Sequence, residues 1–526
     1  MDNIKDKITR GETCIGIEFG STRIKAVLTD FESNPLASGS FDWENSYVNG
    51  IWTYSLEEVF TGLKAAFAKL KADTEDKYGV KLVSCGAMGI SGMMHGYLPF
   101  DKDGNQLAEF RTWRNTITAK AAEELSALFD FNIPQRWSIA HLYRAMQNGE
   151  GHVKDIASLH TLASYIHYRL TGENVIGIGE ASGMFPIDST KNDYDEKMLA
   201  LFGEKTKDYL WSLRDILPKV LVAGEKAGCL TEEGALLLDP TGEFGAGVPF
   251  CPPEGDAGTG MVATNSVAER TGNVSAGTSI FLMVVLEKAL SKLYPEIDMV
   301  TTPGGRPVAM VHGNNCSNEI DAWANMFCSM SKALGADTNI YKTLDKIFEL
   351  ALSGEKDCGG IAGYNYISGE VITDLDEGKP LYFRTTDSRF TPENFARNLL
   401  CSAVATLSIG MEILEGENVK IDRILGHGGY FKAPVAGQTV MAAALGAPVS
   451  VMKTAGEGGP WGMAVLANYM LNKKPGQSLE DYLDSSVFGN QESFEVAPSQ
   501  EDIDGFAKYI ELYKKGLAAE KAAAEI

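Results

Sequence analysis

The sequence lacks the cysteine and histidine patterns of disulfide-linked and zinc-binding proteins. Its eight cysteines are scattered without a Cys-x-x-Cys pair, and its seven histidines include no His-Glu-x-x-His motif. A small fold held by disulfides needs a higher density of cysteine, and a tightly held transition metal needs a ligand cluster. We therefore expect reduced thiols in a cytoplasmic protein. These absences do not exclude a site for a hard ion such as Mg²⁺.

Basic charge and long apolar runs are also scarce. Lys and Arg number 47 against 70 Asp and Glu, which gives a formal net charge of −23 at pH 7. No stretch gathers more than a few basic residues, so we expect neither a nucleic acid nor a membrane surface as a partner. The apolar run at residues 439–452 is too short to cross a bilayer, and residues 1–10 lack the apolar core of an export signal.

Three motifs that often mark nucleotide and hydrolase sites are missing as well. The chain has no Gly-x-x-x-x-Gly-Lys-Ser/Thr loop, no Gly-x-Gly-x-x-Gly after a strand and no Gly-x-Ser-x-Gly elbow. The P-loop, Rossmann and serine-hydrolase interpretations therefore lose their main support.

What is present is an alternation of strands and helices in a chain of 526 residues, which is long enough for two or more domains. The first part reads as three strands in a meander, a helix with one apolar face and a buried strand that ends at a glycine-rich turn. We place these elements at residues 14–19, 24–28, 37–43, 56–77 and 80–90. The pattern predicts an α/β layer fold.

A second copy of the opening begins near residue 267. Residues 267–276 and 280–286 predict two strands around another small-residue turn, about half a chain length after the first pair. Downstream, the pattern predicts a helix at 395–415, a strand at 421–425 and a glycine loop at 456–462 that opens a helix. The repeated pattern of strand, small-residue turn and strand indicates duplication of one lobe, so we predict domains at residues 11–262 and 263–526.

Two tight turns could bind phosphate from opposite sides. Gly20-Ser21-Thr22 and Gly277-Thr278-Ser279 each join two strands, and their N–H groups and hydroxyls suit a polyphosphate. The alternative is that both are ordinary hairpin turns. Glu18 precedes the first turn, where its carboxylate could reach Mg²⁺ or simply face solvent. Lys25 could equally be a phosphate partner or a surface charge.

Asp256 lies in a rigid segment of proline and glycine just before a predicted helix. It could cap that helix, which is the common role of such an aspartate. It could also be the general base that takes a proton from a hydroxyl attacking ATP, because a kinase needs one such carboxylate.

A third group of residues suits a polyol. Met94-His95-Gly96 follows the buried strand at its carboxyl end, where α/β folds bind ligands, and Trp113-Arg114-Asn115 offers an aromatic face, a guanidinium and an amide. His95 could donate to a sugar hydroxyl or be a satisfied core histidine. Trp113 could likewise be a core residue.

Taken in order, these motifs resemble the FGGY carbohydrate kinases, most closely their xylulokinase branch, from about residue 13 to about residue 475. The motifs that carry the resemblance are Gly16-Ile-Glu-Phe-Gly-Ser-Thr22, Met94-His95-Gly96, Trp113-Arg114-Asn115, Leu170-Thr-Gly-Glu173, Glu180-Ala-Ser-Gly183, Gly255-Asp256, Gly277-Thr278-Ser279 and Gly426-His-Gly-Gly429. The resemblance implies two ribonuclease-H-like lobes of the actin, Hsp70 and hexokinase type. It also implies that ATP phosphorylates a sugar hydroxyl in the cleft between them.

The resemblance assigns roles by position. Asp256 would be the catalytic base, and Glu18 and Asp256 would lie near Mg²⁺. The two turns would hold the phosphates of ATP. Adenosine would lie at Gly428, Gly429, Gly458 and Gly459. The sugar would lie at Met94, His95, Gly96, Trp113, Arg114 and Asn115.

Departures from the family pattern concentrate near the sugar. Glu18 and Glu180 stand where the family usually has aspartate. Asn115, preceded by Arg114, also stands where the family usually has aspartate, and Ala257 stands where it often has an amide side chain. A site that pairs hydroxyls discriminates strongly, so the substrate stays open among xylulose, L-ribulose, L-xylulose, L-fuculose, rhamnulose and a polyol such as erythritol. The rival functions are a sugar-independent regulatory ATPase and a non-catalytic sugar sensor. A homodimer is possible.

Overall fold

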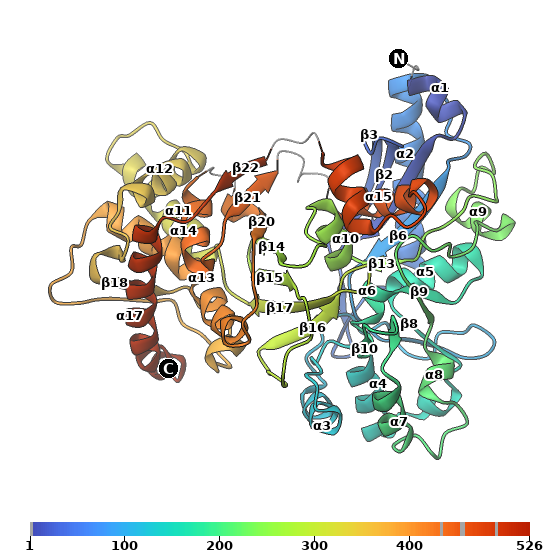
Figure 1. The fold of residues 1–526 in the computed structure, drawn as a ribbon, viewed down its shortest axis with the longest axis horizontal. Helices are drawn as coiled ribbons and strands as arrows, with labels where there is room; N and C mark the ends of the chain where they lie inside the picture. Colours follow the sequence, from blue (N-terminus) through green and yellow to red (C-terminus); the bar gives the residue numbers. More distant parts are fainter. Residues whose placement is uncertain (1–3, 432–434, 453–457, 490–492) are drawn as a thin grey trace.

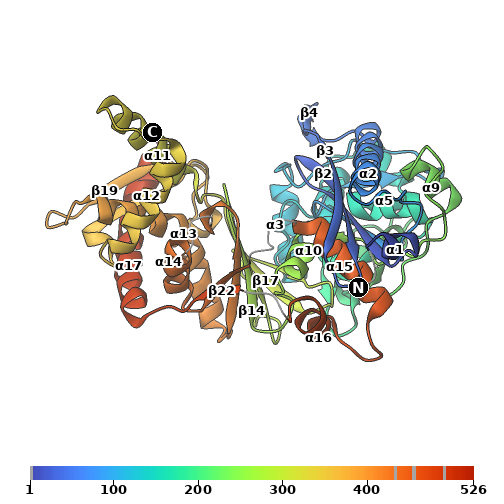
Figure 2. The ribbon, with the colours of Figure 1, turned by 90° about the horizontal axis from the view of Figure 1, so that it is seen from above.

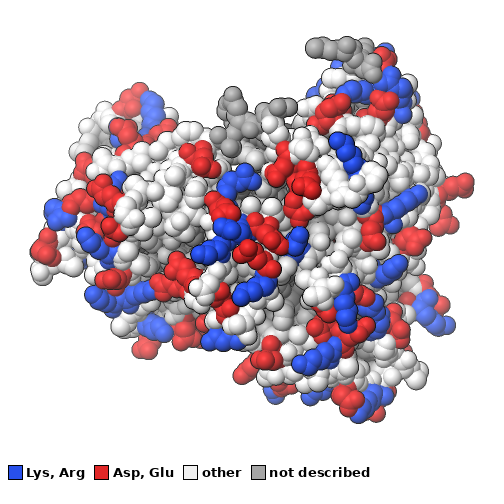
Figure 3. All heavy atoms as spheres, viewed as in Figure 1, with Lys and Arg blue, Asp and Glu red and all other residues white. Residues whose placement is uncertain are grey.

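The computed structural model describes residues 4–431, 435–452, 458–489 and 493–526, which form two α/β lobes side by side (Figures 1 and 2). Each lobe is built on one mixed sheet, five-stranded in the first and seven-stranded in the second. The predicted α/β class with two lobes of this type is confirmed. On the face shown in Figure 3, Lys and Arg are interspersed with Asp and Glu.

The first sheet has the strand order β13-β6-β1-β2-β3. Its members are β1 (Thr13–Phe19), β2 (Arg23–Asp30), β3 (Pro35–Asp42), β6 (Ala87–Gly92) and β13 (Glu254–Gly255). The first three form the predicted antiparallel meander, while β6 pairs with β1 in parallel and β13 pairs with β6 in parallel. The predicted strand at 80–90 begins later, at Ala87, which is in register with Cys14 of β1.

Helices cover both faces of this sheet. Helix α2 (Leu56–Tyr78) begins at a capping box made by Ser55 and Glu58 and packs its apolar side against the face that carries Ile15 and Ile17. The opposite face lies under α10 (Asp256–Ala263) and α15 (Gly458–Asn472). The close approach of α15 requires glycine at position 16, since a Cβ there would collide with the backbone of the helix at Pro460 and Ala464.

The remaining elements of the first lobe are short and lie around and below the sheet in Figure 1. They are α1 (Ile4–Thr9), β4 (Ser46–Val48), β5 (Ile51–Thr53), β7 (Leu98–Phe100), α3 (Ala119–Phe129), α4 (Ser138–Gln147), β8 (Ser158–His160), α5 (Leu162–Thr171), β9 (Val175–Gly177), α6 (Ile178–Ala181), β10 (Ile187–Asp188), β11 (Asp193–Tyr194), α7 (Glu196–Gly203), α8 (Leu213–Ile216), β12 (Lys219–Leu221) and α9 (Glu232–Leu238).

The second sheet repeats the plan of the first. Its order is β16-β17-β15-β14-β20-β21-β22, and its members are β14 (Thr271–Ala276), β15 (Ile280–Val285), β16 (Ile297–Thr301), β17 (Pro307–Gly313), β20 (Arg423–His427), β21 (Val449–Met452) and β22 (Ser493–Val496). The β14–β15 pair is antiparallel like β1–β2, and β14 then pairs in parallel with β20 as β1 does with β6. The internal repeat predicted from the sequence is therefore present in the fold.

Helices and a small hairpin complete the second lobe. They are α11 (Asn318–Ala333), α12 (Ile340–Ser353), β18 (Ile361–Tyr364), β19 (Leu381–Arg384), α13 (Pro392–Gly416), α14 (Ala436–Leu445) and α17 (Gln500–Ala524). By length and composition alone α13 could cross a membrane, but most of its apolar stretch is buried against α12, α14 and the sheet. Its apolar composition therefore reflects its place in a protein core.

The two lobes are not two continuous segments of chain. Helix α15 belongs to the predicted second domain, yet it packs on β1 and β6 of the first sheet, where it is drawn in orange-red beside blue strands (Figure 1). Helix α16 (Leu479–Tyr482) follows it into the same core. That core also includes Met283 and Val300 of the second sheet. A single boundary at residue 262 therefore does not separate the lobes in space.

We predict that Gly16→Ala destabilises the protein. The added methyl would push α15 away from β1, and overpacking of this kind costs about 1–3 kcal/mol. Thermal unfolding followed by circular dichroism would measure the loss. Gly416→Ala is the matched control, because the Cβ there would meet open space at the end of α13. Equal melting temperatures for the two variants would contradict this view of the packing.

Candidate active site

Three strands of the first sheet end at the same edge, and this edge gathers the acidic residues. Glu18 of β1 and Glu254 of β13 are both in register with Ser91 of β6. Strand β13 leads directly into α10, which begins at Asp256. Ser91 and Thr259 of α10 are joined through their hydroxyls at 3.0 Å. The edge therefore brings together residues that are more than 150 positions apart in the sequence.

Asp256 is placed to act as a base. Gly255 occupies the N-cap position of α10 and Asp256 is the first helical residue, so Asp256 does not cap the helix. One carboxylate oxygen, Oδ1, accepts a hydrogen bond from the backbone N–H of Met94 at 3.3 Å. Burial raises the pKa of Asp256 to about 6, although hydrogen bonds from backbone N–H groups oppose the shift. Such a carboxyl is ionised at neutral pH and basic enough to accept a proton.

Glu18 lies beside Asp256 at the start of α15. A Cβ at Gly459 would collide with the Glu18 carboxylate and lie within 3.1 Å of the Thr259 hydroxyl. Burial and the negative charge of Asp256 raise the pKa of Glu18 to about 7, while Lys25, its neighbour on β2, lowers it. The charge of Asp256 therefore affects the pKa of Glu18, as expected for two carboxylates that bind one ion.

The predicted adenosine residues divide between the lobes. Gly459 lies in the first lobe against Glu18, within α15 and not in a loop, while residues 456 and 457 lie outside the described residues. Gly428 lies in the second lobe against the carbonyl of Ala276, with a φ of 103° and no room for a Cβ. The assignment of Gly458 and Gly459 together with Gly428 and Gly429 to adenosine therefore stays a prediction, in which each lobe would contribute two of the glycines.

The structure adds one buried carboxyl that the sequence did not indicate, Glu254, and places the motif residue Glu180 beside it. Glu254 accepts hydrogen bonds from the N–H groups of Glu180, at 2.9 Å, and Gly179, at 3.3 Å, and burial raises its pKa to about 8. Glu180 is completely buried beside Gly255, and burial together with the charges of Asp256 and Glu254 raises its pKa. The sequence signal was the Glu-Gly-Asp run at 254–256, in which only the aspartate attracted attention.

The first predicted phosphate turn is held by aromatic side chains. Trp43 Nε1 donates to the carbonyl of Gly20 at 2.8 Å, and the Tyr54 hydroxyl donates to the carbonyl of Ser21 at 2.5 Å. Trp113 Nε1 reaches the Ser21 hydroxyl at 3.3 Å. The carbonyl oxygens of Gly20 and Ser21, which would repel phosphate, are therefore bound by the protein.

The second predicted turn is anchored in the same way at the start of α11. Ser317 donates to the carbonyl of Gly277 from both its N–H, at 3.1 Å, and its hydroxyl, at 2.7 Å. The N–H of Cys316 donates to the carbonyl of Thr278 at 3.0 Å. Space is open around the Cα atoms of Gly277 and Gly429. The turn thus keeps a fixed shape next to open space.

His95 is a fully bonded residue in this structure. Its Nδ1 lies 3.1 Å from the carbonyl of Gly183, and its Nε2 accepts from Arg136 Nε at 3.1 Å. Burial and the charge of Arg136 lower the pKa of His95 to about 3, so the ring is neutral. The interpretation of His95 as a donor to a sugar hydroxyl therefore does not fit this geometry, because both nitrogens are occupied.

The tryptophan motif divides into one open residue and two that support the structure. Trp113 is 42% exposed. The Arg114 guanidinium stacks on Trp52, 4.4 Å from the ring centre, and donates to Asn45 at 3.1 Å. Asn115 is buried and exchanges two 2.8 Å hydrogen bonds with the backbone of Trp52. Of the three, Trp113 is the residue available to a ligand.

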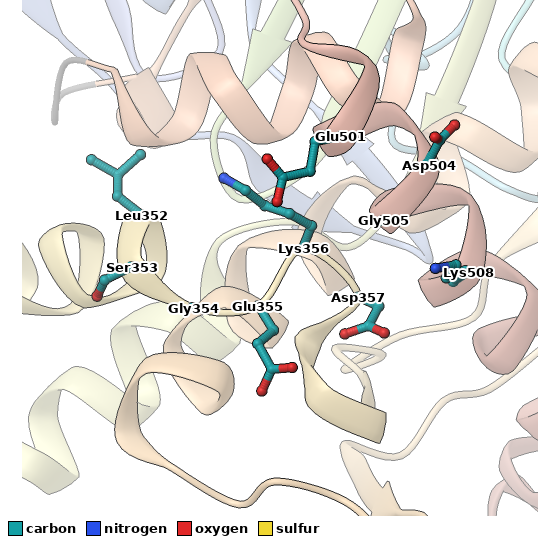
Figure 4. Close-up of a pocket in the computed structure, with 10 residues that line it drawn as sticks. All are labelled: Leu352, Ser353, Gly354, Glu355, Lys356, Asp357, Glu501, Asp504, Gly505 and Lys508. Atoms are coloured by element: carbon teal, nitrogen blue, oxygen red, sulfur yellow. The ribbon is translucent and has the colours of Figure 1, made fainter.

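A large hollow elsewhere in the molecule contains none of these residues. It has a volume of 740 Å³ and lies in the second lobe between the end of α12 and the start of α17 (Figure 4). Its walls carry two lysines among four acidic residues, and Lys356 is paired with Asp502 at 2.9 Å. The hollow is therefore separate from the site at the strand ends.

Comparison with known proteins agrees with the fold. Residues 13–262 match the N-terminal domain and residues 272–471 the C-terminal domain of the FGGY family of carbohydrate kinases. The chain is 24% identical to a xylulose kinase of Haemophilus influenzae over 483 residues, which cover 84% of this chain and 91% of the relative.

Solved structures share the fold at lower identity. A ligand-bound xylulose kinase from Lactobacillus acidophilus matches with a TM-score of 0.79 and 16% identity, over 98% of this chain and 99% of that chain. A Plasmodium falciparum glycerol kinase with ADP matches with a TM-score of 0.76 and 16% identity, over 97% and 98%.

We predict that Glu254→Gln makes the protein more stable at high pH. The folded state raises the pKa of Glu254 from 4.5 to about 8, so it binds this proton more tightly than the unfolded chain does. The wild type therefore loses stability as the pH rises across that interval, and glutamine removes the loss. Melting temperatures should differ at pH 9 and agree at pH 5. Exposed Glu123→Gln is the control, and an equal loss of stability for Glu254→Gln at both pH values would contradict the assignment.

Proposed function

The chain belongs to the FGGY family of carbohydrate kinases, and on that premise we propose that it transfers the terminal phosphoryl group of ATP to a hydroxyl of a ketopentose such as xylulose, with Asp256 as the general base. The observation that carries the proposal is the placement of Asp256. It lies at the shared edge of β1, β6 and β13, beside Glu18 and the turn at Met94.

In the proposed reaction, Asp256 takes the proton of the attacking hydroxyl. The N–H of Met94 binds Oδ1 and so fixes the carboxylate that the sugar hydroxyl would contact. A pKa of about 6 lets Asp256 be ionised before the reaction and hold a proton as the oxygen attacks phosphorus. The remaining work of a kinase is positioning and neutralisation of charge.

The phosphates of ATP would bind at the two turns, one in each lobe. Gly20-Ser21-Thr22 with Lys25 would contact them from the first lobe, and Gly277-Thr278-Ser279 from the second, with adenosine near Gly428 and Gly429. Both turns have carbonyl oxygens already bound by the protein, which supports this role.

Glu18 and Asp256 fit a magnesium ion that is shared with the substrate. Among the described residues no group of three or more His, Cys, Asp or Glu side chains could hold a metal by itself. Mg²⁺ commonly uses one or two protein carboxylates together with phosphate oxygens and water, which is what this pair offers. When bound, the ion would neutralise charge on the phosphates.

The sugar would lie between Asp256, the turn at Met94 and Gly96, and the exposed face of Trp113. Xylulose is favoured because relatives that match most of the chain are named xylulose kinases, such as that of Haemophilus influenzae. The other ketoses and erythritol are alternatives, because Arg114 and Asn115 brace the hairpin at Trp52 and so shape this side of the site. Cytoplasmic location and a homodimer stay predictions.

We predict sugar-dependent ADP formation that disappears in Asp256→Asn. A coupled assay with ATP and Mg²⁺ over ketopentoses, ketohexoses and polyols should show turnover with one ketose. The variant should lose about 100-fold or more in kcat, because it removes the proton acceptor together with one of the two carboxylates proposed for Mg²⁺. Exposed Asp208→Asn is the control. ADP formation that is equal with and without sugars would instead support the regulatory ATPase.

The pH profile supplies a second test. Asp256 must be ionised to accept a proton, and its pKa is raised to about 6. We expect kcat/KM for the sugar to be constant above that value and to fall about tenfold for each pH unit below it. Steady-state rates between pH 4.5 and 8 measure the profile. A rate that stays level down to pH 5 would exclude a base with this pKa.

A further inference from the structure

An ion pair connects the second lobe to the turn that carries Met94 and His95. Asp298 lies on β16 of the second sheet and is 8% exposed. Its Oδ2 accepts a hydrogen bond from Arg136 Nη2, and its Oδ1 accepts one from Asn132 Nδ2 at 3.0 Å. Both partners come from the loop between α3 and α4 in the first lobe. In both contacts, the carboxylate of Asp298 on the second lobe is bound by a side chain of the first lobe.

Arg136 also holds His95 through a second nitrogen of its guanidinium. Its Nε donates to His95 Nε2 at 3.1 Å, which requires that nitrogen to be unprotonated. The ring proton then lies on Nδ1 and is donated to the carbonyl of Gly183. A single guanidinium thus bridges a histidine of the first lobe and a carboxylate of the second.

The backbone at His95 needs such support. Its φ is 70°, in the left-handed region that costs a residue with a side chain, and Gly96 follows with a φ of 99°. Immediately before it, Met94 donates its N–H to Asp256 Oδ1. A rotation of this turn would therefore move the hydrogen bond that the Met94 N–H gives to the Asp256 carboxylate from outside α10.

We propose that Arg136 and Asp298 are positioning residues that tie the orientation of Asp256 to the second lobe. The connection runs from Asp298 to Arg136, then to His95, and through the backbone of the turn to the Met94 N–H and Asp256. This inference rests on the proposed function, because it assumes that Asp256 is the base. It gives His95 a structural task in place of direct contact with the sugar.

The test uses Asp298→Asn and Arg136→Lys in the full chain. Asparagine keeps the size of Asp298 but removes its charge, and lysine keeps the charge of Arg136 but has one nitrogen in place of the two, Nε and Nη2, that contact His95 and Asp298. Because misplacement by about 1 Å can cost about 100-fold in rate, we expect kcat to fall at least tenfold with no change in the KM for ATP. A residue that served stability alone would lower the melting temperature and leave kcat unchanged at saturating substrates.

Asp193→Asn is the matched control, because it breaks an Arg–Asp pair of the first lobe, with Arg214, that is far more exposed. It should leave kcat as in the wild type. Wild-type kcat in both Asp298→Asn and Arg136→Lys would overturn the proposal.

A crystal structure of Arg136→Lys separates this inference from the proposed function. The inference predicts that the turn at His95 rotates and that the contact between the Met94 N–H and Asp256 is lost or lengthened. An unchanged turn would overturn it. If the wild type phosphorylates no sugar, the proposed function fails, and the position of this turn still decides the inference.

Discussion

The parallel pairing of β1, β6 and β13 is the constraint on which the site depends. It sets Glu18, Ser91 and Glu254 in one row and delivers Asp256 one residue beyond the sheet, at the first turn of α10. Helix α15 packs closely on β1 and reaches Glu18, and this close approach needs glycine at positions 16 and 459. Chain segments from the beginning, middle and end of the sequence therefore meet at one edge.

This arrangement gathers four buried or half-buried carboxyl groups at one end of the sheet. Glu18, Glu180, Glu254 and Asp256 all have raised pKa values, and burial is the first cause in each case. A stable core would avoid such a cluster, whereas a phosphoryl-transfer site uses it to supply a base and to attract a cation. The two phosphate turns follow a complementary rule. Trp43 and Tyr54 bind the carbonyl oxygens of one turn and Ser317 binds that of the other, so neither presents those oxygens to an anion.

The strands and helices were predicted well from the sequence, because each depends on the residue pattern within one segment. The meander, the long helix at 56–77 and the repeat near 267 each follow from periodicity within one segment, and all are present. Contacts between distant segments were not predictable in this way. Nothing in the composition of 458–472 indicates that this helix returns to the first sheet, so the position of Gly458 and Gly459 in the first lobe could not be predicted.

The site residues show the same division. Asp256, Glu18 and the two turns could be named from short motifs, since their chemistry is visible in the residues themselves. The saturation of His95 depends on Arg136, 41 positions away, and the role of Asn115 depends on the backbone of Trp52. Glu254 escaped notice because a glutamate next to a proline pair gives no sign of being buried. Partners that are remote in sequence decided these three cases.

The proposed function requires Asp256 to face the hydroxyl that attacks ATP. A crystal structure of the protein with its sugar and a non-hydrolysable ATP analogue tests this most directly. We expect a sugar hydroxyl to lie within about 2.6–3.2 Å of an Asp256 carboxylate oxygen. The same hydroxyl should point at the terminal phosphate. A bound sugar whose nearest hydroxyl to the phosphate is out of reach of Asp256 would contradict it.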